Sequence, residues 1–108
     1  MAWIVEVLDA RVREELEALS AEMRARFRRI VELIQSHGLE QVREPYVKHL
    51  EGPLWEMRMK SKDGHSRAIY VTASGQRVVV VRAFVKKTQK TPRREIDLAL
   101  QRAKEVDQ

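Results

Sequence analysis

The chain has 108 residues, of which 44% are hydrophobic and 34% are charged, and it contains no cysteine. This length suits one domain spanning 1–108, and the composition excludes a disordered tail, because enough apolar side chains are present to offset the chain entropy lost on folding. The absence of thiols excludes disulfide bonds and thiolate metal sites, and the formal net charge of +5 favours a polyanionic partner.

The amino-terminal residues predict a cytoplasmic protein. They show neither the basic flank nor the long apolar region of a signal peptide. No apolar run in the sequence reaches the roughly 20 residues that a membrane span needs. We therefore expect no membrane partner.

A strand and two helices are predicted for the first third of the chain. Residues 3–8 are rich in branched side chains and alternate weakly between apolar and polar, which predicts the strand. Apolar residues then recur at spacings of three and four, and Asp9 and Ser20 are both suited to cap a helix. We expect a helix hairpin over 9–18 and 20–36, with one bent helix as the alternative. The Arg-rich run over 24–29, within the second of these helices, is interpreted as a solvated helix face.

The second half predicts three strands and a helix. Residues 39–53 hold two prolines and no lasting period, which indicates a loop. Turns at Asp63-Gly64 and Ser74-Gly75 then separate three antiparallel strands, over 54–59, 66–73 and 77–87. Continuous valines place the third of these near the middle of a sheet. Thr91 and Pro92 predict the cap and first residue of the last helix.

These elements predict an α+β fold. We expect an N-terminal helix hairpin packed on one face of a twisted, mostly antiparallel sheet of about four strands, with a C-terminal helix. The other face would then end in solvent or in a ligand. Alternation puts Arg82, Phe84 and Lys86 on one face of the last strand, where a base could stack on the ring between cations. A core position is the alternative for Phe84.

Cations gather where the last strand leads into the last helix. Residues 54–95 carry 11 Lys and Arg against 3 Asp and Glu, and the seam itself holds Lys86, Lys87, Lys90, Arg93 and Arg94. Cations in the first turn of a helix oppose its macrodipole at a cost of ~0.3–1 kcal/mol each. A bound phosphate would offset that cost, whereas solvent screening is the alternative.

The available side chains suit RNA cleavage without a cofactor. The three histidines are scattered, so the sequence predicts neither a metal cluster nor a serine–histidine triad, and it has no glycine-rich phosphate loop. The groups able to move protons are Glu56, His65, Tyr70 and a lysine. With arginines on neighbouring strands, such a set could promote attack of an RNA 2′-hydroxyl on the adjacent phosphate.

Two stretches resemble the RelE/HigB superfamily of toxins, in particular its phage-derived branch. They are "GPLWEMRMKSKDGHSRAIYV" and "FVKKTQKTPRREIDLA", and the match spans about residues 46–104 by motif. The resemblance implies a small α+β ribonuclease fold and metal-free cleavage of mRNA, usually on the ribosome. It also implies neutralisation by a cognate antitoxin, often of the helix-turn-helix type.

The resemblance further implies a set of site residues. Arg58 and Arg67 match basic positions at the scissile phosphate, and Lys87 lies near one that helps protonate the leaving group. Glu56 replaces a lysine of some relatives, and no tyrosine is present in the last helix, so Glu56 and Tyr70 complete the catalytic candidates. The RNA-binding candidates are Lys60, Arg82, Phe84, Lys86, Lys90, Arg93 and Arg94. The alternative function is a non-catalytic RNA- or ribosome-binding module with the same fold.

Overall fold

A five-stranded sheet with helices on both faces forms the protein. The computed structural model describes residues 2–88 and 90–107. The elements in chain order are β1 (Ile4–Val7), α1 (Ala10–Glu17), α2 (Ala21–His37), the 3₁₀ turn η1 (Leu39–Gln41), β2 (Val47–Glu51), β3 (Leu54–Ser61), β4 (Gly64–Ala73), β5 (Arg77–Lys86) and α3 (Arg93–Ala103). The strand order is β1-β5-β4-β3-β2; β1 runs parallel to β5, and the other neighbouring pairs are antiparallel. This confirms the expected α+β class.

The helix hairpin forms where the caps predicted it. The Asp9 carboxylate accepts a hydrogen bond from the Arg11 backbone N–H at 3.0 Å, and the Ser20 hydroxyl accepts one from Met23 at 3.2 Å. Gly38 ends α2 with φ of +88°, a conformation that favours glycine. None of the described helices is long and apolar enough to cross a membrane.

The prediction of a loop over 39–53 was wrong, because this segment contains η1 and the edge strand β2. Val47 pairs with Met57 and His49 pairs with Trp55. Sequence pattern missed β2 because most of its side chains are exposed or only partly buried, so no apolar alternation marks it. The sheet therefore has five strands, one more than expected.

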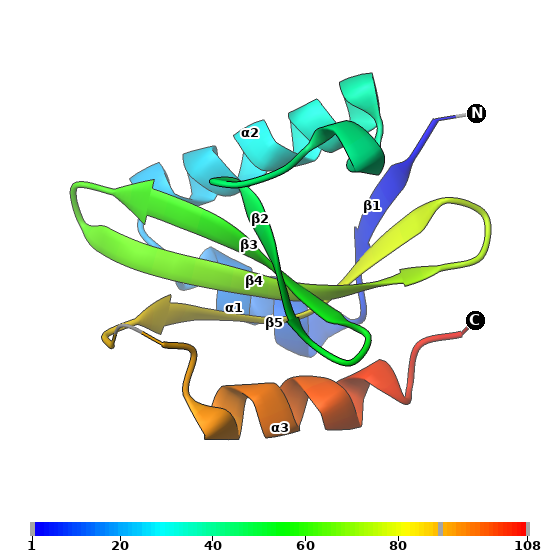
Figure 1. Ribbon diagram of the computed structural model, residues 1–108. Coiled ribbons are helices and arrows are strands. Elements are labelled where there is room, and N and C mark those ends of the chain that lie inside the picture. The colour runs from blue at the N-terminus through cyan, green and yellow to red at the C-terminus, as the bar shows by residue number, and fades with distance from the viewer. Residues whose placement is uncertain (1, 89, 108) are drawn as a thin grey trace.

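The sheet is covered on both faces, although only one covered face was expected. Figure 1 shows α2 above the sheet and α3 below it. One core, on the α2 side, contains Ile30 and Ile34 of α2 with Met57 and Tyr70 of the sheet. A second core contains Ile96 and Ala99 of α3 with Leu54, Ile69, Val79 and Val81. α3 therefore closes one half of the face that was expected to be open.

An ion-pair network ties α1 and α3 to β5 beyond the point where β1 ends. Arg82 pairs with Glu15 of α1 at 2.9 Å and with Glu95 of α3 at 2.6 Å. Arg102 of α3 also pairs with Glu15 at 2.9 Å, and the same carboxylate accepts the Ala83 backbone N–H at 3.1 Å. Glu15 thus accepts a backbone N–H at the edge of β5 and balances the charges of two guanidinium groups.

Replacing Glu15 with alanine should destabilise the fold. The change leaves Arg82 and Arg102 with fewer counter-charges, and we expect the free energy of unfolding to fall by about 3 kcal/mol in chemical denaturation. Glu14→Ala, at an exposed position of the same helix, is the control and should change stability by no more than about 0.5 kcal/mol. Equal effects of the two variants would contradict the role of the network.

Candidate functional site

Strand register assembles the candidate site as rows of side chains on the α3 side of the sheet. Residues directly opposite each other on neighbouring strands have Cβ atoms about 4.5–5.5 Å apart, and alternate residues share a face. The register across β3, β4 and β5 aligns Lys60–His65–Lys86, then Arg58–Arg67–Phe84, then Glu56–Ile69–Arg82. Three short strand segments therefore bring five cations, a histidine and a carboxylate to one area.

Glu56 lies at the centre of the cationic rows and is almost fully buried. Its carboxylate lies 3.5 Å from the Arg67 Nε and 3.8 Å from the Arg58 Nε. Its other oxygen accepts a hydrogen bond from the Thr91 hydroxyl at 2.7 Å. One carboxylate thus holds two guanidinium groups together and is itself anchored from the segment that leads into α3.

The sequence predicted Thr91 as the cap of α3, and this prediction was wrong. Pro92 is the cap residue and makes no side-chain hydrogen bond to the helix. The Thr91 hydroxyl turns toward the sheet and reaches Glu56 instead. Pattern could place Thr91 before a helix but could not show which acceptor its hydroxyl meets.

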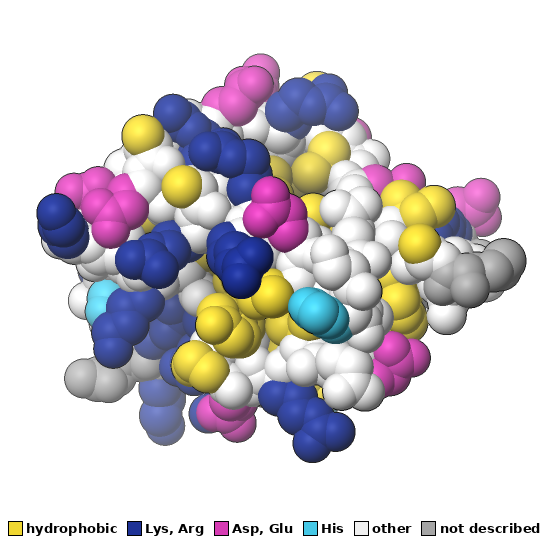
Figure 2. Space-filling model, turned by 90° about the horizontal axis from the view of Figure 1, so that it is seen from above, with side chains coloured by type: hydrophobic (Ala, Val, Ile, Leu, Met, Phe, Trp, Pro, Cys, Tyr) yellow, Lys and Arg dark blue, Asp and Glu magenta, His cyan; other side chains and the backbone are white. Residues whose placement is uncertain are grey.

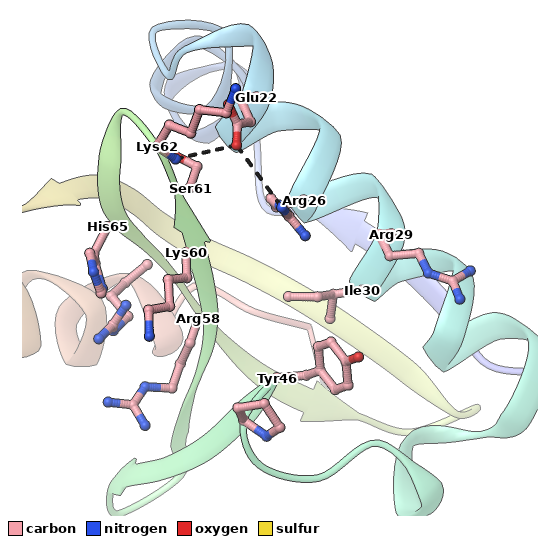
Figure 3. Close-up of a pocket in the computed structure, with 12 residues that line it drawn as sticks. Glu22, Arg26, Arg29, Ile30, Tyr46, Arg58, Lys60, Ser61, Lys62 and His65 are labelled. Atoms are coloured by element: carbon pink, nitrogen blue, oxygen red, sulfur yellow. Dashed lines mark hydrogen bonds and ion pairs between the residues drawn. The ribbon is translucent and has the colours of Figure 1, made fainter.

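A basic hollow of about 700 Å³ opens beside these rows, between α2 and the edge of β3. Figure 3 shows that Arg26 and Arg29 come from α2, whereas Arg58 and Lys60 come from β3. Lys62, His65 and Arg67 also line it, so that six cations face one carboxylate, Glu22. In the view from the α2 side, Lys and Arg side chains gather over this end of the molecule (Figure 2). The hollow suits a polyanion.

The electrostatics of the site are those of cations held together with too little negative charge. Burial lowers the pKa of Arg67, and Arg58 lowers it further, while Glu56 acts in the opposite direction. His65 is exposed, but partial loss of hydration lowers its pKa, and the neighbouring charges of Arg67, Lys60, Lys86 and Arg58 lower it further. A bound phosphate would relieve this repulsion, and His65 is neutral at pH 7 without it.

Lys86 experiences the same field. It stands opposite His65 in the register, on the side of β4 away from Lys60. Partial burial lowers its pKa, Arg67 adds to that effect, and Glu56 opposes it. A lysine with a lowered pKa releases its proton more readily, as a general acid must.

The structure brings together part of the predicted set. Arg58, Arg67 and Lys60 line the basic hollow, with Glu56 behind them. Arg67 was expected on an open sheet surface. It is only 2% exposed and instead forms the floor of the hollow. The arginines of α2 were missed, because the Arg-rich run was interpreted as a solvated helix face.

Tyr70 lies away from these residues. It is three positions after Arg67, so strand alternation turns it to the opposite face of the sheet. There it is 1% exposed and packs in the core beneath α2, and burial raises its pKa. The structure therefore does not support Tyr70 as a partner of Arg58 and Arg67 in catalysis.

Two predicted RNA-binding arginines have acidic partners within the chain. Arg82 is held by Glu15 and Glu95. Arg93 pairs with Glu51 at 2.8 Å and with Asp97 at 2.9 Å, so carboxylates offset its cost at the helix start. These contacts give both arginines a structural role, and their contact with RNA stays a prediction.

The remaining predicted residues lie outside the basic hollow. Phe84 is 8% exposed and belongs to the core under α3, which corrects the expected stacking platform. Three further candidates, Lys87, Lys90 and Arg94, lie beyond the end of β5, and their side chains are exposed. Arg94 is 3.8 Å from Glu95. Gln89, within the motif that suggested the family, lies outside the described residues.

Metal-ligand geometry is not found in the described part of the chain. Among residues 2–88 and 90–107, no group of three or more His, Asp or Glu side chains is placed to hold a metal ion.

Comparisons with known proteins agree with this fold. The sequence pattern of a family described as "Phage derived protein Gp49-like (DUF891)" matches residues 14–104. A mutant of the E. coli toxin RelE in the free state superposes with a TM-score of 0.67 and 16% identity, covering 94% of this chain and 98% of that one. A chain of the archaeal RelE–RelB complex from Pyrococcus horikoshii OT3 superposes with a TM-score of 0.57 and 21% identity, covering 79% of this chain and 96% of that one. No curated protein matches the sequence significantly.

Thr91→Val should lower the free energy of unfolding, because it removes a hydrogen bond to Glu56. The valine keeps the shape of the side chain but leaves one oxygen of the buried Glu56 carboxylate without its donor, which costs about 1–3 kcal/mol. Denaturant unfolding should show this loss for Thr91→Val and little loss for Thr91→Ser, which keeps the hydroxyl. Wild-type stability of the valine variant would mean that the Glu56 contact is dispensable.

Proposed function

The chain belongs to the Gp49-like family of phage-derived proteins and has the fold of the RelE toxins, and from this starting point we propose that it is an endoribonuclease toxin. Its substrate in this proposal is mRNA, bound at the ribosome. The basic hollow binds the RNA backbone. The rows of side chains around Arg58 and Arg67 hold the scissile phosphate.

The observation that carries the proposal is the buried Arg67 beside Arg58, two cations that share the single carboxylate of Glu56 within residues 2–88 and 90–107. A guanidinium group that is 2% exposed has lost most of its hydration. Lys60 and Lys86 stand in the adjacent row and add further positive charge. A phosphodiester whose charge grows in the transition state is the ligand that this arrangement would stabilise most.

The proposed reaction uses the RNA's own 2′-hydroxyl. Neutral His65 takes the proton of that hydroxyl, whose oxygen bonds to the adjacent phosphorus while the bond from phosphorus to the 5′-oxygen breaks. Lys86 gives a proton to the departing 5′-oxygen, leaving a 2′,3′-cyclic phosphate and a 5′-hydroxyl. Arg58 and Arg67 bind the phosphate oxygens, and Glu56 is a positioning residue. Lys86 replaces Lys87 in the role that the family resemblance suggested.

The proposal includes an antitoxin partner and a cytoplasmic site of action. The archaeal RelE of the same fold was crystallised with RelB. A cognate antitoxin, of the helix-turn-helix type as the family resemblance implies, would cover the basic hollow or hold it in an inactive state. Ribosomes and mRNA place the reaction in the cytoplasm.

A non-catalytic RNA- or ribosome-binding module is the second candidate. One observation favours it: the Glu56 carboxylate is buried and engaged by Thr91 and Arg67, so it is poorly placed to take a proton, which leaves the exposed His65 as the candidate base. In that case the same cations would bind RNA without cleaving it.

Expression of the chain in bacteria should arrest growth, and Arg58→Ala should relieve the arrest. Removing a cation at the scissile phosphate should lower the cleavage rate of RNA about 10²- to 10³-fold, measured with purified protein and ribosome-bound mRNA. Arg28→Ala removes an exposed arginine of α2 outside the basic hollow and serves as the control. RNA that is bound but never cut by the wild-type chain would favour the second candidate.

The cleavage rate should depend on pH in two steps. A general base works when deprotonated, so the rate should rise with pH through the pKa of His65, which lies below the ordinary 6.5. A general acid works when protonated, so the rate should fall again through the pKa of Lys86, below the ordinary 10.5. His65→Gln should remove the acid-side rise; a rise that persists in this variant would assign the base elsewhere.

A further inference from the structure

A second hollow lies on the opposite face of the sheet and is lined by aromatic side chains. Its volume is about 810 Å³, and its walls include Trp3, His49, Trp55 and Tyr70, with Val42 and Val47 among them. We refer to it as the aromatic hollow. The proposed cleavage reaction does not use any of these residues.

Contacts within the chain hold the aromatic walls in place. Trp55 is 39% exposed although it is a large apolar side chain on a strand. The His49 ring meets it edge to face, with ring centroids 5.0 Å apart and planes at 63°. His49 is fixed in turn by a 2.9 Å hydrogen bond between Nε2 and the Gly52 carbonyl. An exposed indole held in this way offers a rigid stacking surface.

Tyr70 supplies a polar group at the bottom of the aromatic hollow. It is 1% exposed and lines the hollow. Burial alone raises its pKa, so the hydroxyl keeps its proton and can donate. A ligand that brings a carbonyl oxygen or a ring nitrogen into the hollow would give this donor an acceptor.

Charge distinguishes this hollow from the basic one. Its charged lining residues are Arg43 and Lys48 against Glu40 and Glu44, so they balance. Such a site suits an uncharged planar ring with a polar edge better than a phosphate group.

The two hollows share a wall. Arg43, Glu44 and Val47 line the aromatic hollow, whereas Pro45 and Tyr46, between them in sequence, line the basic hollow. On β3, Trp55 and Arg58 are three residues apart, which is about 10 Å along a strand. A single strand of nucleic acid could therefore contact both.

We propose that the aromatic hollow is a nucleobase-binding subsite, which holds an unstacked base of the same RNA whose backbone lies in the basic hollow. The inference rests on the proposed RNA-binding function. The base stacks on Trp55, and its polar edge accepts a hydrogen bond from Tyr70. Residues around this hollow would then influence which RNA sequences are bound.

Tryptophan fluorescence can test this proposal directly, because both tryptophans of the chain line the aromatic hollow. Titration uses a short single-stranded DNA, which lacks the 2′-hydroxyl and is not cut. A strand of equal length with abasic positions has the same phosphates without the bases. We expect saturable quenching by the first strand and at least about fivefold weaker binding of the second.

Two variants and a control complete the test. Tyr70→Phe keeps the ring and should weaken binding of the normal strand a few-fold, and Trp55→Ala should abolish the difference between the strands. Ile4→Ala removes an exposed apolar side chain that lines neither hollow and should bind like wild type. A free nucleoside monophosphate should bind more weakly than the strand.

Equal binding of the normal and abasic strands would overturn the proposal and would leave an apolar segment of a protein partner as the occupant. Equal binding of the free nucleotide and the strand would also overturn it, because the two hollows would then act separately. Since the titration measures no cleavage, it can succeed even if the chain is not a nuclease. Failure of the subsite and failure of the proposed reaction are therefore separate results.

Discussion

The buried carboxylate of Glu56 is the constraint on which the site depends. Without a shared counter-ion, Arg58 and Arg67 would repel each other across neighbouring strands, and Arg67 would be buried unpaired. Glu56 reduces that repulsion without cancelling it, and Thr91 anchors Glu56 from the segment before α3. The fold therefore holds excess positive charge at one place, and the proposed phosphate binding depends on this charge.

Cations in this chain serve two different purposes. Arg82 has two carboxylate partners, from α1 and α3, and fastens both helices to β5. Arg93 likewise has two carboxylate partners, although it begins a helix where a cation is unfavourable. Arg58 and Arg67 share a single one. The number of acidic partners, and not the density of cations in sequence, separates structural arginines from those free to bind a ligand.

The two faces of the sheet carry different recognition chemistry. The face toward α3 presents guanidinium and ammonium groups beside the basic hollow, and the opposite face presents aromatic rings around Tyr70. The segment over 43–47 and the strand β3 connect them. RelE structures share the fold at 16% and 21% identity, which shows a common fold and assigns no role to the side chains of either hollow.

Local pattern was sufficient for most of the secondary structure and for the α+β class. Ser20 marks a helix start, alternation over 54–59 gives two unlike strand faces, and the family motifs indicate the fold, because these signals act within a few residues. The edge strand β2, the acidic partners of Arg82 and the contact of Thr91 with Glu56 came only with tertiary structure. Each depends on contacts between residues far apart in sequence, and neither spacing nor composition specifies which distant side chain completes such a contact.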